Sequence, residues 1–97
     1  ELPAEYSLSQ NYPNPFNPST KIKFSIPNTP LSFGEGQGVG LFIYNSLGQQ
    51  ITTLINQQLT PGTYEVEWDA SNFPSGLYFY QLTSGEYSET KKMILLK

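Results

Sequence analysis

Three carboxylates, those of Glu65, Glu67 and Asp69, are spaced two residues apart. On an extended strand, residues at this spacing share one face, so the three side chains would project together. Such a group suggests either a glycosidase carboxylate pair or a set of calcium ligands. A glycosidase, however, needs its two carboxylates on opposite sides of the scissile bond, with one kept protonated in an apolar pocket. Three acids on one outward face therefore favour a solvated strand surface over either site.

Residues 34–38, Gly-Glu-Gly-Gln-Gly, have the glycine content of a phosphate-binding loop. A nucleotide fingerprint requires a preceding strand, the spacing G-x-G-x-x-G and a following helix whose N-terminal amides bind phosphate. Here the spacing differs, and the pattern of a strand follows. This segment is therefore predicted to be a loop that binds no nucleotide.

The composition excludes most other chemistry. The 97 residues include five lysines and eight acids, which give a net charge of −3, but no histidine, cysteine or arginine. Without histidine or cysteine the chain has no imidazole or thiolate, either as nucleophile or as metal ligand, and no disulfide. An acidic chain without arginine is also poorly suited to nucleic-acid phosphates. We therefore expect no enzymatic activity, no cofactor or metal, and no nucleic-acid partner.

The elements that position these side chains are predicted to be strands. Alternation of apolar and polar residues recurs along the chain, and helical periodicity does not. Glycine and proline separate the alternating segments, which lie at residues 6–8, 20–26, 39–44, 50–55, 63–68, 77–82 and 87–96. Segments of this number and spacing in one short chain predict an all-β fold, a seven-stranded antiparallel immunoglobulin-like sandwich without a disulfide.

Some residues are expected to shape this sandwich. Turns are predicted at Gly48 and at Pro61-Gly62, since glycine accepts a positive φ and proline presets the second position of a turn. Trp68 is expected in the core. The stretch before the second strand must be extended or turning because proline fixes φ there; it contains Pro13, Asn14, Pro15 and Phe16.

Aromatic residues leave open a second kind of site. In residues 77–82, Leu77, Phe79 and Gln81 alternate with Tyr78, Tyr80 and Leu82, so one of these two faces is expected to be core and the other partly exposed. Exposed aromatic rings can stack on sugars, although a sandwich without disulfides also needs aromatic side chains in its core. Core packing is favoured, and a carbohydrate-binding surface remains an alternative.

The end of the sequence is its most unusual part. Three of the five lysines lie in the last seven residues and bracket a four-residue apolar run, residues 93–96. That run is far too short for a membrane helix, so no membrane insertion is expected. The lysines could protect an edge strand from aggregation. Alternatively, a partner could recognise this segment as a displayed signal, through lysine charge and strand addition.

Several segments, in order, resemble the type IX secretion C-terminal sorting domains, a flagellar-cap-like immunoglobulin fold of type A. The resemblance is carried by Leu8 to Pro18, Thr20 to Pro27, Leu41 to Gln49, Pro61-Gly62-Thr63-Tyr64, Trp68-Asp69-Ala70, Pro74-Ser75-Gly76-Leu77-Tyr78 and Lys91 to Lys97. Relative to the family pattern, residues 28–38 resemble an insertion in the loop between two strands. A longer loop there should be tolerated, because each doubling of loop length costs only about 0.6 kcal/mol.

The resemblance implies a division of the chain and a set of partners. Residues 1–8 would be the linker to an upstream cargo domain, and residues 9–97 the sorting domain. The domain would direct its cargo through the periplasm and an outer-membrane translocon of a Gram-negative bacterium, to the cell surface or the medium. A sortase-like peptidase would then remove the domain, which is expected to be a monomer. A carbohydrate- or surface-binding accessory module and a structural spacer are the alternatives.

The resemblance also implies which residues the export machinery would contact. The family's glycine-x-tyrosine element falls on Gly76 and Tyr78, and its terminal signal falls on the last residues of the chain. The implied partner-binding residues are therefore Gly76, Tyr78, Lys91, Lys92, Met93, Leu95, Leu96 and Lys97. Gly76 has a local reason as well, because it opens a strand where a positive φ is expected.

Overall fold

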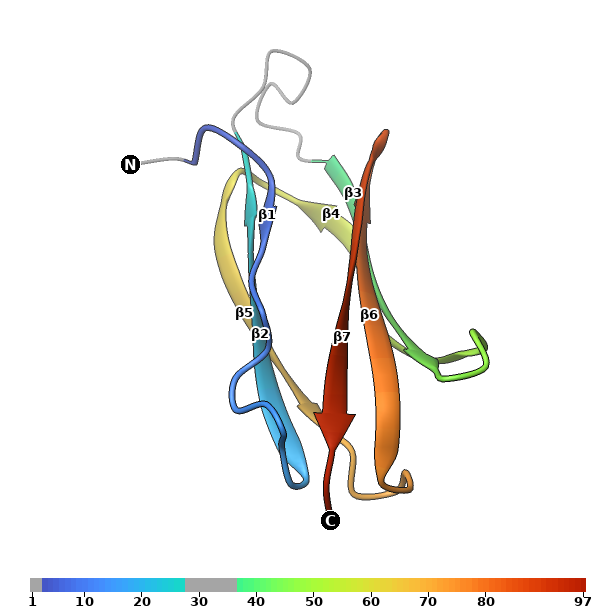
Figure 1. The fold of residues 1–97 in the computed structure, drawn as a ribbon. Helices are drawn as coiled ribbons and strands as arrows, with labels where there is room; N and C mark the ends of the chain where they lie inside the picture. The colour runs from blue at the N-terminus through green and yellow to red at the C-terminus, as the bar shows by residue number, and fades with distance from the viewer. Residues whose placement is uncertain (1–2, 28–36) are drawn as a thin grey trace.

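The computed structural model describes residues 3–27 and 37–97, which form two antiparallel sheets (Figure 1). The strands are β1 (Ser7–Leu8), β2 (Ser19–Ile26), β3 (Gln37–Asn45), β4 (Gln50–Leu59), β5 (Gly62–Asp69), β6 (Gly76–Ser84) and β7 (Tyr87–Leu95). This confirms the predicted seven-stranded all-β sandwich. Among these residues there is no helix of the length and hydrophobicity that a membrane crossing requires.

The smaller sheet has the strand order β1-β2-β5. Its alternation follows the sequence closely: Ile22, Phe24 and Ile26 on β2 are fully buried, and the residues between them are more exposed. Trp68 of β5 lies opposite Thr20 and is buried as predicted. The inner face of this sheet therefore consists of the apolar positions that the period of two selects.

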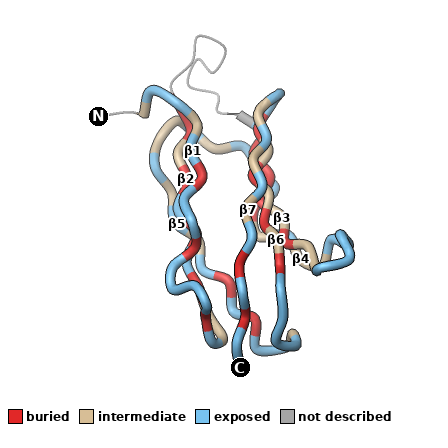
Figure 2. Tube along the Cα trace, viewed as in Figure 1, coloured by how far each residue is buried: buried red, intermediate tan, exposed pale blue. Residues whose placement is uncertain are grey.

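The larger sheet has the order β4-β3-β6-β7, so that β7 lies at its edge. Its buried residues again alternate with more exposed ones, and Figure 2 shows the buried positions in red along the strands. They are Val39, Leu41 and Ile43 of β3, Tyr78, Tyr80 and Leu82 of β6, and Met93 and Leu95 of β7. The prediction that one face of residues 77–82 is core is confirmed.

The strand boundaries differ from the prediction around the β3–β4 hairpin. β4 continues to Leu59, four residues beyond the predicted end, because its backbone pairs with β3 as far as Gln37. Its last residues are largely polar, so alternation gave no sign of this pairing. β3 also starts at Gln37, within the segment predicted as a loop; residues 28–36 of that proposed insertion lie outside the described residues.

The predicted turn at Gly48 is present between β3 and β4. The Asn45 side-chain oxygen accepts hydrogen bonds from the backbone amides of Leu47 and Gln49, at 2.9 and 3.0 Å. Gly48 has a φ of 83°, in the left-handed region that glycine adopts without steric cost. The glycine therefore closes the hairpin in the conformation that the turn requires.

Candidate functional site

The last strand has two faces of different character. Met93 and Leu95 are fully buried, whereas Ile94 and Leu96 keep 42% and 56% of their surface exposed. Leu77 of β6 lies opposite Ile94 in the sheet and is 39% exposed. Lys92, also exposed, completes a surface that we call the terminal face: Leu77, Lys92, Ile94 and Leu96. An apolar group of this kind, with an adjacent cation, is typical of an interaction surface.

The residues implied by the resemblance are thus divided between the core and the surface. Lys92, Leu96 and Lys97 are exposed, while the side chains of Met93, Leu95 and Tyr78 are not available to a partner. Ile94 and Leu77 belong to the exposed set, and the resemblance did not single them out. The strict alternation of β7 could have identified Ile94, because it lies between two residues that must both face inward.

Gly76 and Tyr78 have structural roles at the start of β6. Gly76 has a φ of 155°, which confirms the expected positive φ, and a Cβ added there would meet no atom within 4 Å. Glycine is therefore favoured at this position by the backbone conformation, and not because a larger side chain would lack space. Tyr78 packs its ring edge-on against Trp68, with centroids 5.5 Å apart, and its hydroxyl donates to the backbone oxygen of Pro74 at 2.7 Å.

A segment from the beginning of the chain covers the edge of β7. We call this segment, residues 10–16, the strap. The backbone amide of Ile94 donates to Asn14 Oδ1 at 3.0 Å, and the amide of Phe16 donates to the backbone oxygen of Ile94 at 2.9 Å. The amide of Leu96 donates to the backbone oxygen of Phe16 at 2.9 Å, and Gln10 Nε2 donates to the backbone oxygen of Lys92 at 2.8 Å. The C-terminal half of the edge is therefore paired.

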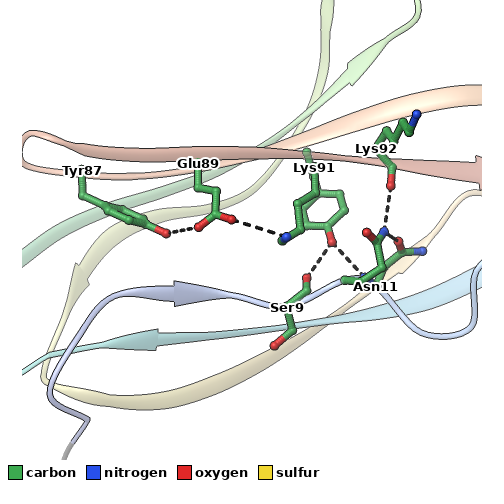
Figure 3. A network of polar contacts seen from close by, with 8 residues as sticks. Ser9, Asn11, Tyr87, Glu89, Lys91 and Lys92 are labelled. Atoms are coloured by element: carbon green, nitrogen blue, oxygen red, sulfur yellow. Dashed lines mark hydrogen bonds and ion pairs between the residues drawn. The ribbon is translucent and has the colours of Figure 1, made fainter.

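The strap is anchored to the core by Tyr80. The Tyr80 hydroxyl donates to the backbone oxygen of Ser9 at 2.6 Å and accepts from the backbone amide of Asn11 at 2.8 Å (Figure 3). Burial raises the pKa of Tyr80 to about 12, because the phenolate would lose its hydration. The hydroxyl is therefore neutral at physiological pH and can donate and accept at once.

The three lysines near the end of the sequence have different surroundings. Lys91 Nζ lies 3.4 Å from Glu89 Oε2, and Glu89 Oε1 also accepts from the Tyr87 hydroxyl at 2.6 Å (Figure 3). The hydrogen bond from Tyr87, and then the charge of Lys91, lower the pKa of the Glu89 carboxyl. Lys92 points away from this network, and within the described residues its ammonium has no hydrogen-bond or ion-pair partner.

Lys97 is attached to the loop between β5 and β6. Its Nζ donates to the backbone oxygen of Ser71 at 2.5 Å, and its backbone amide donates to Ser75 Oγ at 2.9 Å. Asp69 is hydrogen-bonded by the hydroxyl and amide of Ser71, which together lower the pKa of its carboxyl. Of the three lysines, only Lys92 therefore presents an uncommitted charge beside exposed apolar side chains.

The three carboxylates of β5 are exposed to solvent. Glu65, Glu67 and Asp69 alternate along the exposed face of β5, as expected for a solvated strand surface. In residues 3–27 and 37–97 there is no group of three acidic, histidine or cysteine side chains arranged to hold a metal ion. Two half-buried aromatic residues, Tyr44 and Phe79, lie on the larger sheet. Together with Gly48, Gln81 and Thr90 they line a shallow hollow of about 320 Å³.

Comparisons with known proteins place this arrangement in a family. A search of curated proteins found no match to the chain. A family model described as the secretion system C-terminal sorting domain matches residues 10–96, a range that includes the strap, the Gly48 turn, Trp68 and the terminal face. Since this match spans nearly the whole sandwich, the chain belongs to the C-terminal sorting domains of type IX secretion.

Proposed function

We propose that this domain directs the export of a polypeptide joined to its N-terminal end, and that the export machinery contacts the terminal face. Membership of the family implies interaction with the type IX secretion machinery, and a destination at the cell surface or outside the cell. The family is not an enzyme family, in keeping with recognition rather than catalysis. The additional step in this proposal is the identity of the contacting residues.

The observation that carries the proposal is the exposure of apolar side chains at the end of β7 and at the paired start of β6. Leu77, Ile94 and Leu96 each lie next to a buried residue in an alternating strand pattern, so their side chains face outward and keep 39%, 42% and 56% of their surface exposed. Burying such side chains against a partner is favourable by about 25 cal/mol per Å² of apolar surface. The terminal face therefore has the composition of the apolar centre of an interface.

The positive charge of Lys92 in the terminal face indicates which chemical groups the partner should carry. Lys92 is opposite Phe79 in the sheet, and its ammonium is free to pair with an incoming carboxylate. Lys91 and Lys97 are already engaged by Glu89 and by the backbone of Ser71. The complementary surface is therefore an apolar groove with at least one carboxylate next to it, because such a pair gains strength when water is excluded.

Separation of the domain from its cargo is a second part of the proposal. Ser7 and Leu8 pair with Ser25 and Phe24, so these two residues belong to the folded sheet. A sortase-like peptidase would then cut before Ser7, where the chain precedes the first paired residue. The cut would release the cargo, or make its new C-terminal end available for attachment at the cell surface.

The experiment fuses a secreted carrier protein to residues 1–97 in a bacterium with a type IX system. Ile94→Ser and Leu96→Ser should lower the exported fraction of the carrier, whereas Leu47→Ser should not. Leu47 is the matched control because it is 82% exposed but lies in the β3–β4 turn. Equal export of the intact fusion and of a fusion ending at Thr90 would contradict the proposal.

The aromatic hollow favours a carbohydrate-binding function as the second candidate. Tyr44 lies opposite Phe79, and the Tyr44 hydroxyl donates to Gln81 Oε1 at 3.1 Å. Two rings beside an amide and the Thr90 hydroxyl could contact a sugar ring and its hydroxyl groups. Titration of the domain with polysaccharides tests this function: saturable binding that Phe79→Ala abolishes would support it, and its absence would leave sorting alone.

A further inference from the structure

The strap and the terminal strand are far apart in sequence and adjacent in the structure. Asn14 and Ile94 are separated by 80 positions, yet the Asn14 side chain accepts the hydrogen bond of the Ile94 amide. Phe16 makes two backbone hydrogen bonds to the same strand, and the two residues Phe16 and Leu95 form a parallel bridge. The strap thus takes the place of a neighbouring strand for the last residues of β7.

These contacts fix the strand that carries the terminal face. An edge strand presents a row of unpaired amide and carbonyl groups, and pairing them restricts its position. The paired groups belong to Lys92, Ile94 and Leu96, the same three residues whose side chains form most of the terminal face. The position of this recognition surface therefore depends on a segment at the other end of the chain.

We propose that Asn14 is a positioning residue for the terminal face, and that the export partner recognises a preformed surface of side chains. This inference rests on the proposed function. Asn14 holds Ile94 through a side-chain acceptor, and the partner docks on Lys92, Ile94 and Leu96 without adding a strand to that half of the edge. A partner that captured the same residues by strand addition would first have to displace the strap, because the backbone groups it needs are already bonded.

The contacts of Asn14 distinguish a positioning role from a general contribution to the stability of the fold. Asn14 is exposed and packs no apolar group in the core, whereas Phe16 beside it is buried. Loss of the Asn14 acceptor should therefore release the Ile94 amide locally and leave the rest of the sandwich unchanged. Amide hydrogen exchange measures such local opening residue by residue.

The test uses three variants of the 97-residue chain. Asn14→Ala removes the acceptor, and Asn14→Asp keeps an oxygen that can accept from the Ile94 amide. Asn17→Ala is the matched control, since Asn17 is exposed in the same stretch and its side chain makes no hydrogen bond within the described residues. In Asn14→Ala the exchange protection of Ile94 should fall by roughly fivefold, the effect of one lost hydrogen bond. Protection of Val39 in the core should not change.

The same variants are then fused to the carrier protein and assayed for export. Asn14→Ala should lower the exported fraction, Asn14→Asp should restore it and Asn17→Ala should leave it unchanged. Wild-type export by Asn14→Ala, despite lost protection at Ile94, would overturn the positioning role, and so would unchanged protection. If Asn14→Ala fails to fold, Gln10→Ala replaces it, because it removes the donor to the Lys92 backbone oxygen, together with the hydrogen bond to Asn11 Oδ1, and should act in the same direction.

Failure of the inference can be distinguished from failure of the proposed function. If the unmodified fusion is not exported, or Leu96→Ser has no effect, the proposed function is wrong. If the unmodified fusion is exported and Leu96→Ser lowers export, but Asn14→Ala does not, only the positioning role is wrong. The comparison therefore needs all of these fusions in one strain.

Discussion

The ring of Phe16 packs against the indole of Trp68, with centroids 5.8 Å apart and an angle of 51° between the planes. The indole also contacts Phe73 and Tyr78, at 5.5 Å each. This aromatic cluster joins the strap, both sheets and the loop between β5 and β6. In a sandwich without a disulfide, it connects the two layers at the end where the terminal face lies.

Phe16→Ala should destabilise the domain by about 3–5 kcal/mol, because it removes a buried ring and leaves a cavity beside Trp68. Urea unfolding monitored by tryptophan fluorescence measures this change directly. Tyr12→Ala in the same stretch is the control: Tyr12 is 80% exposed, so the change should stay within about 0.5 kcal/mol. If Phe16→Ala, like Tyr12→Ala, changed the free energy of unfolding by no more than about 0.5 kcal/mol, the stability would not depend on this ring.

Gly76→Ala should destabilise the domain by more than about 1 kcal/mol, since alanine is strained at a φ of 155°. Gly38→Ala is the matched control. A Cβ at Gly38 would also meet no atom within 4 Å, and no positive φ is found there. Thermal unfolding of the two variants should therefore isolate the effect of the positive φ, because an added Cβ meets no atom at either position. A Gly38 variant as unstable as the Gly76 variant would contradict this account.

Substitution of the neighbouring residues Leu95 and Leu96 should affect two different properties of the domain, its stability and its export. Leu95→Ala should cost about 2–5 kcal/mol of stability because Leu95 is fully buried. Leu96→Ala should change stability by no more than about 0.5 kcal/mol but should lower export. Denaturant unfolding and the carrier-export assay, applied to both variants, test this separation. A Leu96 variant that is exported normally would exclude its side chain from the recognition surface.

The domain should lose stability in alkali. Folding raises the pKa of Tyr80 to about 12 from an unfolded value near 10, mainly by burial, with a further contribution from the charge of Glu89. The stability due to the protonated hydroxyl is therefore complete below pH 10 and lost as the pH rises from 10 to 12, by at most about 1.4 kcal/mol per pH unit. Burial and the hydrogen bond to Glu89 raise the pKa of Tyr87 in the same direction.

Urea unfolding between pH 8 and 12 measures this loss. Tyr80→Phe should be less stable at pH 8, because the backbone groups of Ser9 and Asn11 lose their partner. Its stability should then decline less steeply between pH 10 and 12 than that of the wild type. An identical slope in both proteins would assign the alkaline transition to other groups.

Local patterns in the sequence were sufficient to predict most of the fold. Alternation identified the seven described strands and the buried residues of β2 and β3, because the sequence of each segment by itself shows the period of two. For β6 it predicted that one face would be core. It could not predict how far β4 extends, since the pairing there involves the backbone of polar residues. It also could not predict that Phe16 would meet Trp68, which depends on how two distant segments pack.

The candidate site was harder to predict for the same reason. The resemblance pointed to the final residues as a group, but burial separates Met93 and Leu95 from Ile94 and Leu96. The hydrogen bond between Asn14 and Ile94 spans nearly the whole chain, and no local pattern encodes it. Contacts of this kind follow from the closed sandwich, so only the structure identifies them.

The two ends of the folded chain lie at opposite ends of the molecule's longest dimension, which is 43 Å (Figure 1). A mechanical load applied between the start of β1 and the last residues therefore runs along the strands. Hydrogen bonds between strands lie across that direction, so those joining β7 to β6 and to the strap would be sheared together. A force on the terminal strand in this direction would therefore load these hydrogen bonds at the same time, and not one after another.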